Sequence, residues 1–484
     1  MNTIFKTIIL TATFALTTCF GLSAAGQSYT NSSRHTFQFL DDCDTAFTRS
    51  YKGSSLVTCA NLSGTSITNA ACFIIRDELS TTAKILYIPR YNNHIGAMTD
   101  HITDMKILNG ICYFCGTRII PIEYSENTRS FVHDTVGFVG HFSIEDVLNG
   151  SGYYYWEDFS EVSSFSKMAV TDKVDAADAG LMIIGTRKDV PNNTCLACIK
   201  QPSSSNLWKY YITDTDIDNE IFTDVITTEW LWVTASIIKD GTDSIIFRHT
   251  KIGNFGFYDE SFSGGAPLES LFRISYLGIY RRKNTPVLLC SMYNDNFSAG
   301  FSSFNPEQGV IHTIGNIYVM HMAYPNSMQQ VHSIQTEPGS TIKDLTYLPN
   351  IHSTATLHRS RASLFDHTQN NYLQCVCWNK TEEYCDTAMH LSNGQLLSLD
   401  TYQGGFVALG GQRNTYKPTD VIQRFYGRQN SCLLTDGCKT IDILSTTIPD
   451  YIKSSFSKIT DELDKGWVPH AFESATGTAV PCTH

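Results

Sequence analysis

Four aspartates recur in short related phrases, and acids repeated in this way could collect a cation or a sugar around a central channel. The phrases span 102–105, 222–225, 342–345 and 418–421, and they contain Asp104, Asp224, Asp344 and Asp420. The first three aspartates are spaced by 120 residues. A ligand site needs a single group of converging residues, whereas a scaffold needs one bracing residue in each repeated unit. Regular recurrence therefore favours a structural role, in which each carboxylate accepts hydrogen bonds from turn amides and locks neighbouring units together.

A second group of candidate residues is a run of aromatic side chains beside two carboxylates. The run is 153–159, Tyr-Tyr-Tyr-Trp-Glu-Asp-Phe, and its candidate binding residues are Tyr153, Tyr155, Trp156, Glu157 and Asp158. Aromatic faces could stack on a sugar ring while the carboxylates accept hydrogen bonds from its hydroxyls. In a strand, however, alternate side chains would face the core. Packing alone is therefore an alternative explanation for half of the run.

The cysteines could bind metal, carry out redox chemistry or form disulfides. Two Cys-x-x-Cys spacings occur, at Cys112/Cys115 and Cys195/Cys198. Residues i and i+3 of a strand project to opposite faces, so the first pair could not grip one ion. Disulfides are the default expectation, with Cys432/Cys438 as the local pair across a turn. A third cluster, Cys375, Cys377 and Cys385, leaves its connectivity open, and no metal or cofactor is expected.

Histidines are scattered and define no catalytic motif. His94 and His101 lie near aspartates in the sequence, and His133 precedes Asp134. Nucleophilic catalysis would need a nucleophile held against such a pair, and neither a Gly-x-Ser-x-Gly nor a His-Glu-x-x-His motif occurs. Catalytic residues therefore stay unassigned, although two acids from distant segments could still converge as a glycosidase pair.

Composition limits the classes of partner. The 484 residues carry a formal net charge of −12, which disfavours nucleic acid and anionic lipid as partners. Residues 1–26 have the features of a signal peptide: Lys6, an apolar stretch, and small residues at Ser23 and Ala25. We expect no transmembrane segment after its removal. The protein is accordingly expected to be exported to the periplasm, the cell surface or the exterior, where disulfides persist.

Short strand signals dominate the remaining sequence. Runs such as 111–117, 181–186 and 230–235 are aromatic or β-branched, and turn dipeptides such as Asn109-Gly110 bound them. The 4-3-4 spacing of Ile452, Phe456, Ile459 and Leu463 predicts one helix near the C-terminus. An aspartate phrase, a buried strand and a Gly/Phe-rich strand follow one another twice, which indicates a meander repeated along the chain.

These patterns resemble those of secreted bacterial β-propellers, a likeness of architecture that carries no diagnostic family motif. The resemblance implies an all-β ring with a central channel and a loop-built upper face. Because 120 residues divide into two units of about 60, we predict a propeller of about seven four-stranded blades, with six or eight as alternatives. The expected organisation is a signal peptide at 1–26, a propeller at 27–445, and a C-terminal helix and tail at 446–484 packed on the ring.

The sequence supports three functional hypotheses. The first is a secreted binding or interaction protein that recognises a glycan or protein ligand through propeller loops. The second is a carbohydrate-active hydrolase or lyase that uses acids from several blades, and the third is a structural component of a surface assembly. A shared fold does not select among them.

Overall fold

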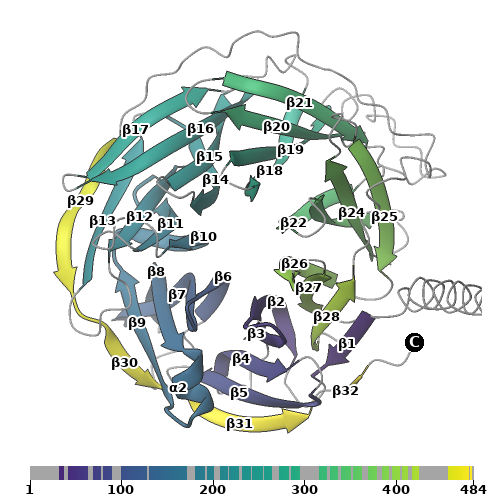
Figure 1. Cartoon of the computed structure of the whole chain (residues 1–484). Coiled ribbons are helices and arrows are strands. Elements are labelled where there is room, and N and C mark those ends of the chain that lie inside the picture. The colour runs from purple at the N-terminus through teal and green to yellow at the C-terminus, as the bar shows by residue number, and fades with distance from the viewer. Residues whose placement is uncertain are drawn as a thin grey trace, which may run out of the picture.

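The chain folds into a ring of β-sheets around a central axis, as the computed structural model in Figure 1 shows. Seven antiparallel sheets follow one another around this ring, and we number them as blades 1 to 7 in chain order. The structure describes residues 32–37, 42–63, 69–77, 80–89, 100–127, 130–171, 180–190, 193–200, 208–215, 217–227, 232–240, 242–253, 256–263, 272–282, 285–294, 316–323, 327–335, 340–349, 353–361, 369–378, 384–391, 395–403, 406–412, 417–424, 456–478 and 480–481.

Blades 1 to 6 are meanders of four consecutive strands, which pair in chain order from the channel to the rim. Blades 1 to 3 contain β2 (Cys43–Tyr51), β3 (Ser55–Leu62), β4 (Asn69–Asp77) and β5 (Thr82–Pro89); β6 (Asp100–Leu108), β7 (Ile111–Ser125), β8 (Ser130–Ser143) and β9 (Tyr153–Phe159); and β10 (Val162–Thr171), β11 (Gly180–Arg187), β12 (Thr194–Lys200) and β13 (Trp208–Thr215). A short helix, α2 (Ile144–Leu148), links β8 to β9.

The remaining strands of the ring follow the same order. Blades 4 to 6 contain β14 (Glu220–Thr227), β15 (Trp232–Asp240), β16 (Thr242–Gly253) and β17 (Gly256–Ser263); β18 (Phe272–Arg282), β19 (Thr285–Asn294), β20 (Asn316–Ala323) and β21 (Ser327–Gln335); and β22 (Ser340–Leu348), β23 (Ser353–Arg361), β24 (Gln369–Trp378) and β25 (Tyr384–Leu391). Blade 7 combines β26 (Gln395–Tyr402), β27 (Phe406–Gln412) and β28 (Pro418–Arg424) with β1 (Ser32–Thr36). Because β1 pairs with β28, early and late parts of the chain share one sheet and close the ring.

The structure confirms the predicted β-propeller of about seven blades. Asp104, Asp224 and Asp344 lie on β6, β14 and β22, the innermost strands of blades 2, 4 and 6. The 120-residue spacing of these aspartates therefore spans two blades, as the division into units of about 60 predicts.

Local sequence explains how tightly the strands are joined. Asn109 and Gly110 form the two-residue connection between β6 and β7, with φ of 50° and 82°. Both values lie in the left-handed region that a type I′ hairpin requires, which Asn and Gly tolerate best. At Gly116 a Cβ would lie 2.0 Å from the backbone oxygen of His101, so only glycine allows these two strands to pair this closely.

The apolar core lies in the seams between blades. One cluster joins Phe73 of blade 1 to Phe114 and Phe142 of blade 2, with ring centroids 5.1 and 4.9 Å from that of Phe73. Another joins blades 2 and 3 through Phe159 and Phe165. Since each blade is buried on both faces, its strands read as continuous apolar runs rather than as alternating ones.

Seven cysteines with described side chains are buried: Cys43, Cys59, Cys72, Cys112, Cys115, Cys195 and Cys198. Cys112 packs in the seam between blades 1 and 2, while Cys115 packs in the seam between blades 2 and 3. Burial raises the pKa of the Cys112 thiol well above its ordinary value. Cys112 and Cys115 thus project to opposite faces of their strand, as the i, i+3 spacing predicts. Cys432 and Cys438 lie outside the described residues, and the backbone register places Cys377 opposite Cys385.

The C-terminal segment contradicts the helix predicted near residue 450. Residues 456–465 form β29 (Phe456–Lys465), which pairs with the outer strand of blade 3; residues 446–455 lie outside the described part. Two bulges interrupt the β13–β29 register, between Tyr210 and Ile212 and between Ile212 and Thr213. Each bulge inserts an extra residue in β29 and interrupts the alternation of its side chains between the two faces. The apolar residues therefore fall at intervals of three and four, which resemble the spacing of a helix.

After β29 the chain continues along the rim as a belt, shown in yellow in Figure 1. We define the belt as β29 with β30 (Val468–Ala471), β31 (Glu473–Thr478) and β32 (Val480–Pro481). These strands pair in turn with β13, β9, β5 and β1, on blades 3, 2, 1 and 7. The belt thus adds a fifth strand to four neighbouring sheets, including the sheet that closes the ring.

Two buried aromatic residues anchor the belt where it steps between blades. Trp467 lies in the seam of blades 2 and 3 and stacks on Trp208, with ring centroids 4.7 Å apart. Phe472 lies in the seam of blades 1 and 2, against Phe142 and Tyr154. Most side chains of β30 and β31 are exposed, so these two anchors supply most of the apolar burial from Trp467 to Thr478.

Two further sequence predictions concern membranes and export. Among the described residues, no helix has the length and apolar character needed to span a bilayer. The predicted signal peptide, residues 1–26, lies outside the described residues.

Phe472→Ala is expected to lower the free energy of unfolding by about 3–5 kcal/mol, because it empties a packed seam under the belt. Urea unfolding followed by circular dichroism measures this loss. Val468→Ala, at an exposed position four residues earlier, serves as the control. Equal stability of the two variants would show that Phe472 is not an anchor.

Candidate functional site

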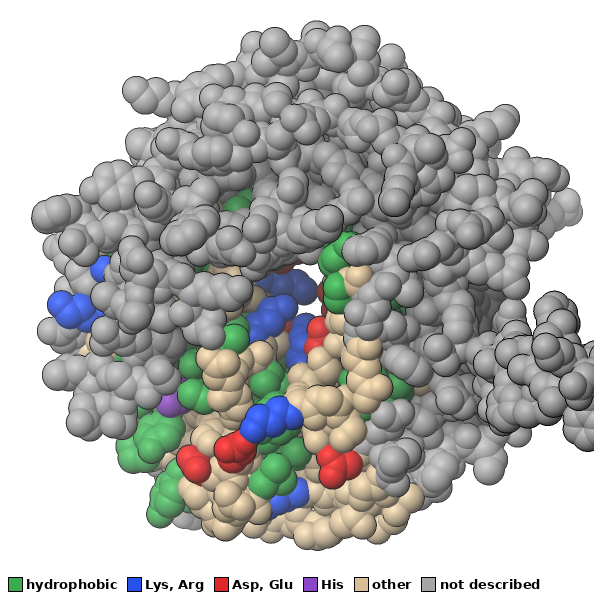
Figure 2. All heavy atoms as spheres, in the orientation of Figure 1, with side chains coloured by type: hydrophobic (Ala, Val, Ile, Leu, Met, Phe, Trp, Pro, Cys, Tyr) green, Lys and Arg blue, Asp and Glu red, His purple; other side chains and the backbone are tan. Residues whose placement is uncertain are grey.

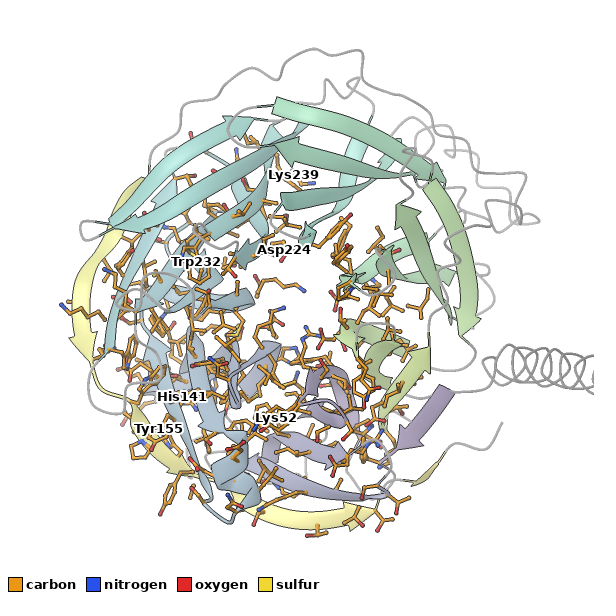
Figure 3. All side chains as sticks on the ribbon, viewed as in Figure 1. Lys52, His141, Tyr155, Asp224, Trp232 and Lys239 are labelled. Carbon is orange, nitrogen blue, oxygen red and sulfur yellow. The ribbon has the colours of Figure 1, made fainter. Side chains whose placement is uncertain are left out.

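The clearest cluster of charged groups surrounds the ring centre, and its aspartates follow one local geometry. In β6, β14 and β22 a register shift immediately precedes Asp104, Asp224 and Asp344. Such a bulge turns the following side chain out of the regular alternation. Figure 3 shows the result for Asp224, whose side chain lies at the inner end of its blade, beside the channel.

Each of these carboxylates bridges two blades. In all three, Oδ1 accepts a hydrogen bond from the next amide of its own strand, at 2.8–3.0 Å. Oδ2 accepts from an amide on the innermost strand of the following blade: from Met168 to Asp104 at 3.0 Å, from Ile279 to Asp224 at 2.9 Å, and from Leu399 to Asp344 at 2.9 Å. The aspartates thus lie across the seams between blades 2 and 3, 4 and 5, and 6 and 7.

The fourth sequence phrase does not supply a fourth bridge of this kind. Asp420 lies on β28 and accepts hydrogen bonds from Nε and Nη2 of Arg76, in a fully buried pair. The equivalent bridge comes instead from Asp400, which accepts from the amide of Thr401 at 2.9 Å and from that of Ser50 at 2.8 Å. Asp400 does not belong to a repeated phrase, because Ser398 occupies the bulge position there. The available sequence signal was its spacing of one blade from Asp344.

Arg49 connects blades across the channel. Its Nη2 lies 3.1 Å from Oδ1 of Asp104 on blade 2, and its Nη1 lies 3.8 Å from Oδ2 of Asp344 on blade 6. Nε donates to the backbone oxygen of Met105 at 3.0 Å. Only 7% of Arg49 is exposed, so one guanidinium ties blade 1 to two other blades near the axis.

Lysines balance the remaining negative charge. Lys106 lies 3.8 Å from Asp104, and Lys167 reaches the same region from β10. Burial alone would lower the pKa of Lys167, but the nearby carboxylates of Asp344 and Asp104 outweigh it and raise that pKa. Figure 2 shows Lys and Arg side chains beside acidic ones around the opening at the ring centre.

The same charges set the protonation of the aspartates. Burial would raise the pKa of Asp104, but Lys106 and Arg49 overcome it and hold that pKa at about 2. Asp224 has weaker compensation, so burial raises its pKa despite the opposing effect of Lys167. A glycosidase needs one carboxyl group with a raised pKa beside another that stays ionised. Here, however, both oxygens of each carboxylate already accept backbone amides.

This arrangement is suited to holding blades together rather than to acid–base chemistry. A general acid or nucleophile must present an oxygen to the substrate, and these oxygens face the seams. Among the residues that the structure describes, no group of three or more potential metal ligands converges.

The predicted aromatic binding residues are divided between the two faces of β9. Trp156 is 2% exposed and stacks on Phe138 at 3.8 Å, in the seam of blades 1 and 2. Its Nε1 donates to Asp158 at 2.7 Å, and Arg118 lies over its ring at 3.9 Å.

The other members of the aromatic run lie apart from Trp156. Tyr155 packs against His141, and Glu157 pairs with Lys465 of the belt at 2.6 Å. Tyr153 is exposed. The structure therefore does not bring these five side chains together as one stacking platform, and β30 covers the edge of their strand.

The strands β7 and β8 form a long hairpin that the sequence did not predict. These strands have 15 and 14 residues, and they extend beyond the segments that pair with β6 and β9. Ile122 is 64% exposed and Val132 is 49% exposed near its far end. Lys188 of blade 3 pairs with Asp134 and fixes the hairpin against its neighbour.

Comparisons with known proteins add little to this geometry. No protein-family model matches the chain, and no curated protein matches it. One similar solved structure is a chain from a S. cerevisiae assembly of Dbp5 with Nup159, Gle1, IP6 and ADP, at 8% identity and a TM-score of 0.36, covering 81% of this chain and 94% of that one. Another is the Bombyx mori GH32 β-fructofuranosidase BmSUC1, at 7% identity and a TM-score of 0.31, covering 81% and 91%. Likenesses this weak assign no activity.

Asp104→Asn is expected to remove a pH-dependent part of the stability. With a native pKa of about 2 and an ordinary value of 3.8, Asp104 stabilises the fold above pH 4, and this contribution is lost as pH falls towards 2. The stability difference between wild type and variant should shrink by about 2 kcal/mol over that range. Urea unfolding at pH 6, 4, 3 and 2 measures it, with Asp218→Asn in an exposed turn as control. A difference that stays constant with pH contradicts the assignment.

Arg49→Met is expected to lower the free energy of unfolding by about 3–5 kcal/mol, because it leaves buried carboxylates on two blades without their shared cation. Thermal unfolding at pH 7 measures the loss. Lys52→Met, which removes an exposed cation paired with Glu145, is the control and should leave the midpoint unchanged. If the two variants melt together, Arg49 does not connect the blades energetically.

Proposed function

We propose that the protein is an exported binding protein that holds a protein ligand on the ring face bearing the β7–β8 hairpin. The observation that carries this proposal is the engagement of the channel carboxylates. Asp104, Asp224, Asp344 and Asp400 each accept hydrogen bonds from backbone amides on two blades, which leaves them as braces. Binding needs no free acid pair, whereas a hydrolase does.

The burial of Trp156 within the aromatic run favours a protein over a glycan as ligand. Sugar recognition uses exposed aromatic faces, and Trp156 packs between blades instead. Ile122 and Val132, by contrast, present apolar side chains to solvent at the end of a projecting hairpin. Apolar contacts of this kind are typical of protein interfaces.

Site-specific photocrosslinking in the producing cell tests the proposal. A photoreactive residue at position 122 should give a discrete adduct, whereas one at exposed Leu148 should not. Leu148 belongs to α2 and lies at the opposite end of β8 from the hairpin turn, so it is a matched control. The purified partner should then bind at least tenfold more weakly to the double variant I122S/V132S, because both apolar contacts are lost.

Two outcomes would overturn the binding hypothesis. One is equal adducts from positions 122 and 148. The other is turnover of a polysaccharide that Asp224→Asn abolishes while the fold is retained, which would favour a carbohydrate-active enzyme. Selective binding on a glycan array without a protein adduct would replace the protein ligand with a glycan.

A further inference from the structure

The belt contains a short, weakly buried strand between its two aromatic anchors. The strand β30 pairs with β9 through four residues, from Val468 opposite Trp156 to Ala471 opposite Tyr153. Val468, Pro469 and Ala471 are exposed, so backbone hydrogen bonds and the flanking anchors hold β30 in place. One histidine lies against the anchor Trp467, just before β30, and a second is part of β30 itself.

The first histidine, His141, lies beneath the anchor Trp467. Their ring centroids are 4.6 Å apart, and Tyr155 and Tyr113 approach His141 at 5.0 and 5.9 Å. Within the described part of the chain, neither ring nitrogen of His141 has a hydrogen-bond partner. Burial lowers the pKa of His141 to about 4. Figure 3 places His141 and Tyr155 at the outer side of the ring, next to the belt.

The second histidine, His470, belongs to the belt itself. It stacks on Tyr154 with ring centroids 5.3 Å apart. Burial and then the nearby guanidinium of Arg118 lower the pKa of His470, while Asp158 opposes them. A proton on either imidazole is therefore unfavourable while β30 remains docked.

We propose that the belt is an acid-sensitive strap, held at β30 while His141 and His470 are uncharged and released from β9 when both imidazoles gain protons. This proposal goes beyond the proposed function and does not depend on it. The charged groups on the elements that meet the start of β30 are Lys465 of β29, Glu157 of β9 and Glu161 of the turn after β9, and Lys465 interacts with both carboxylates. The pKa of His141 is lowered by burial. Glu157 is already paired with Lys465, so it is not a free partner for an imidazolium.

The direction of the effect follows from proton linkage. In the released state both imidazoles are hydrated and titrate near 6.5, so release takes up protons and becomes more favourable as pH falls. Between pH 7.5 and 4.5, His141 alone should shift the release equilibrium by about tenfold to hundredfold. His470 acts in the same direction.

Hydrogen–deuterium exchange of the full chain at pH 7.5 and 4.5 tests the strap. Labelling times are scaled for the slower intrinsic exchange in acid. Peptides covering 465–478 should lose at least tenfold in protection at pH 4.5, whereas peptides of the interior strand β11 should not. The double variant H141F/H470F should keep its protection, because phenylalanine fills both sites without titrating. H101F, which changes a part-buried histidine on β6, should behave as wild type.

The outcomes separate the two histidines from other acid-sensitive contacts. If H141F does not fold, H470F is tested alone, because His470 is the less buried of the two. This variant must still reduce the acid effect severalfold. Acid release that persists in a folded double variant would assign it to the Glu157–Lys465 pair and overturn the proposal. Unchanged protection of 465–478 in the wild type would overturn it as well.

Discussion

The bridge from a bulged aspartate to the amide of the next blade is the constraint on which the ring depends. Apolar seams hold neighbouring blades together, but apolar packing is not directional and would tolerate sliding. A carboxylate that accepts one amide from each of two strands fixes their relative height, as Asp104 does for Met105 and Met168. Where no aspartate is present, other side chains take over: Asn61 donates to the oxygen of Ile102 and accepts from its amide.

Because carboxylates join the blades, cationic side chains must lie beside them near the ring centre. Buried carboxylates need nearby cations, and Arg49, Lys106 and Lys167 supply them from blades 1, 2 and 3. An ionic network of carboxylates and cations therefore lines the opening at the ring centre. The exposed apolar side chains of Ile122 and Val132 lie away from this network, on the projecting hairpin.

Much of the architecture could be predicted from the sequence because it depends on local rules. Strand runs, turn dipeptides and a two-blade period were sufficient for the ring. The failures have identifiable causes: bulges in β29 gave an apolar spacing that resembled a helix, and a chance phrase selected Asp420. Arg49 could not be found, because its partners are brought together only when the ring closes, and the role of Asp400 was signalled only by its spacing of one blade from Asp344. The role of Trp156 depended on which face of β9 is covered, a fact of packing rather than of composition.

The odd number of blades has a consequence for the ring. Bulged aspartates occupy blades 2, 4 and 6, so blades with and without one alternate around the ring. With an odd number of blades, this alternation cannot hold at every junction. One junction must therefore join two blades of the same kind, and here it is the junction of blades 7 and 1. There Ser398 accepts the amide of Thr48 at 2.9 Å, and Asp400 is displaced by two residues from the usual position. The mismatch thus falls beside blade 7, the sheet in which early and late strands meet and whose four ring strands are not consecutive in the chain.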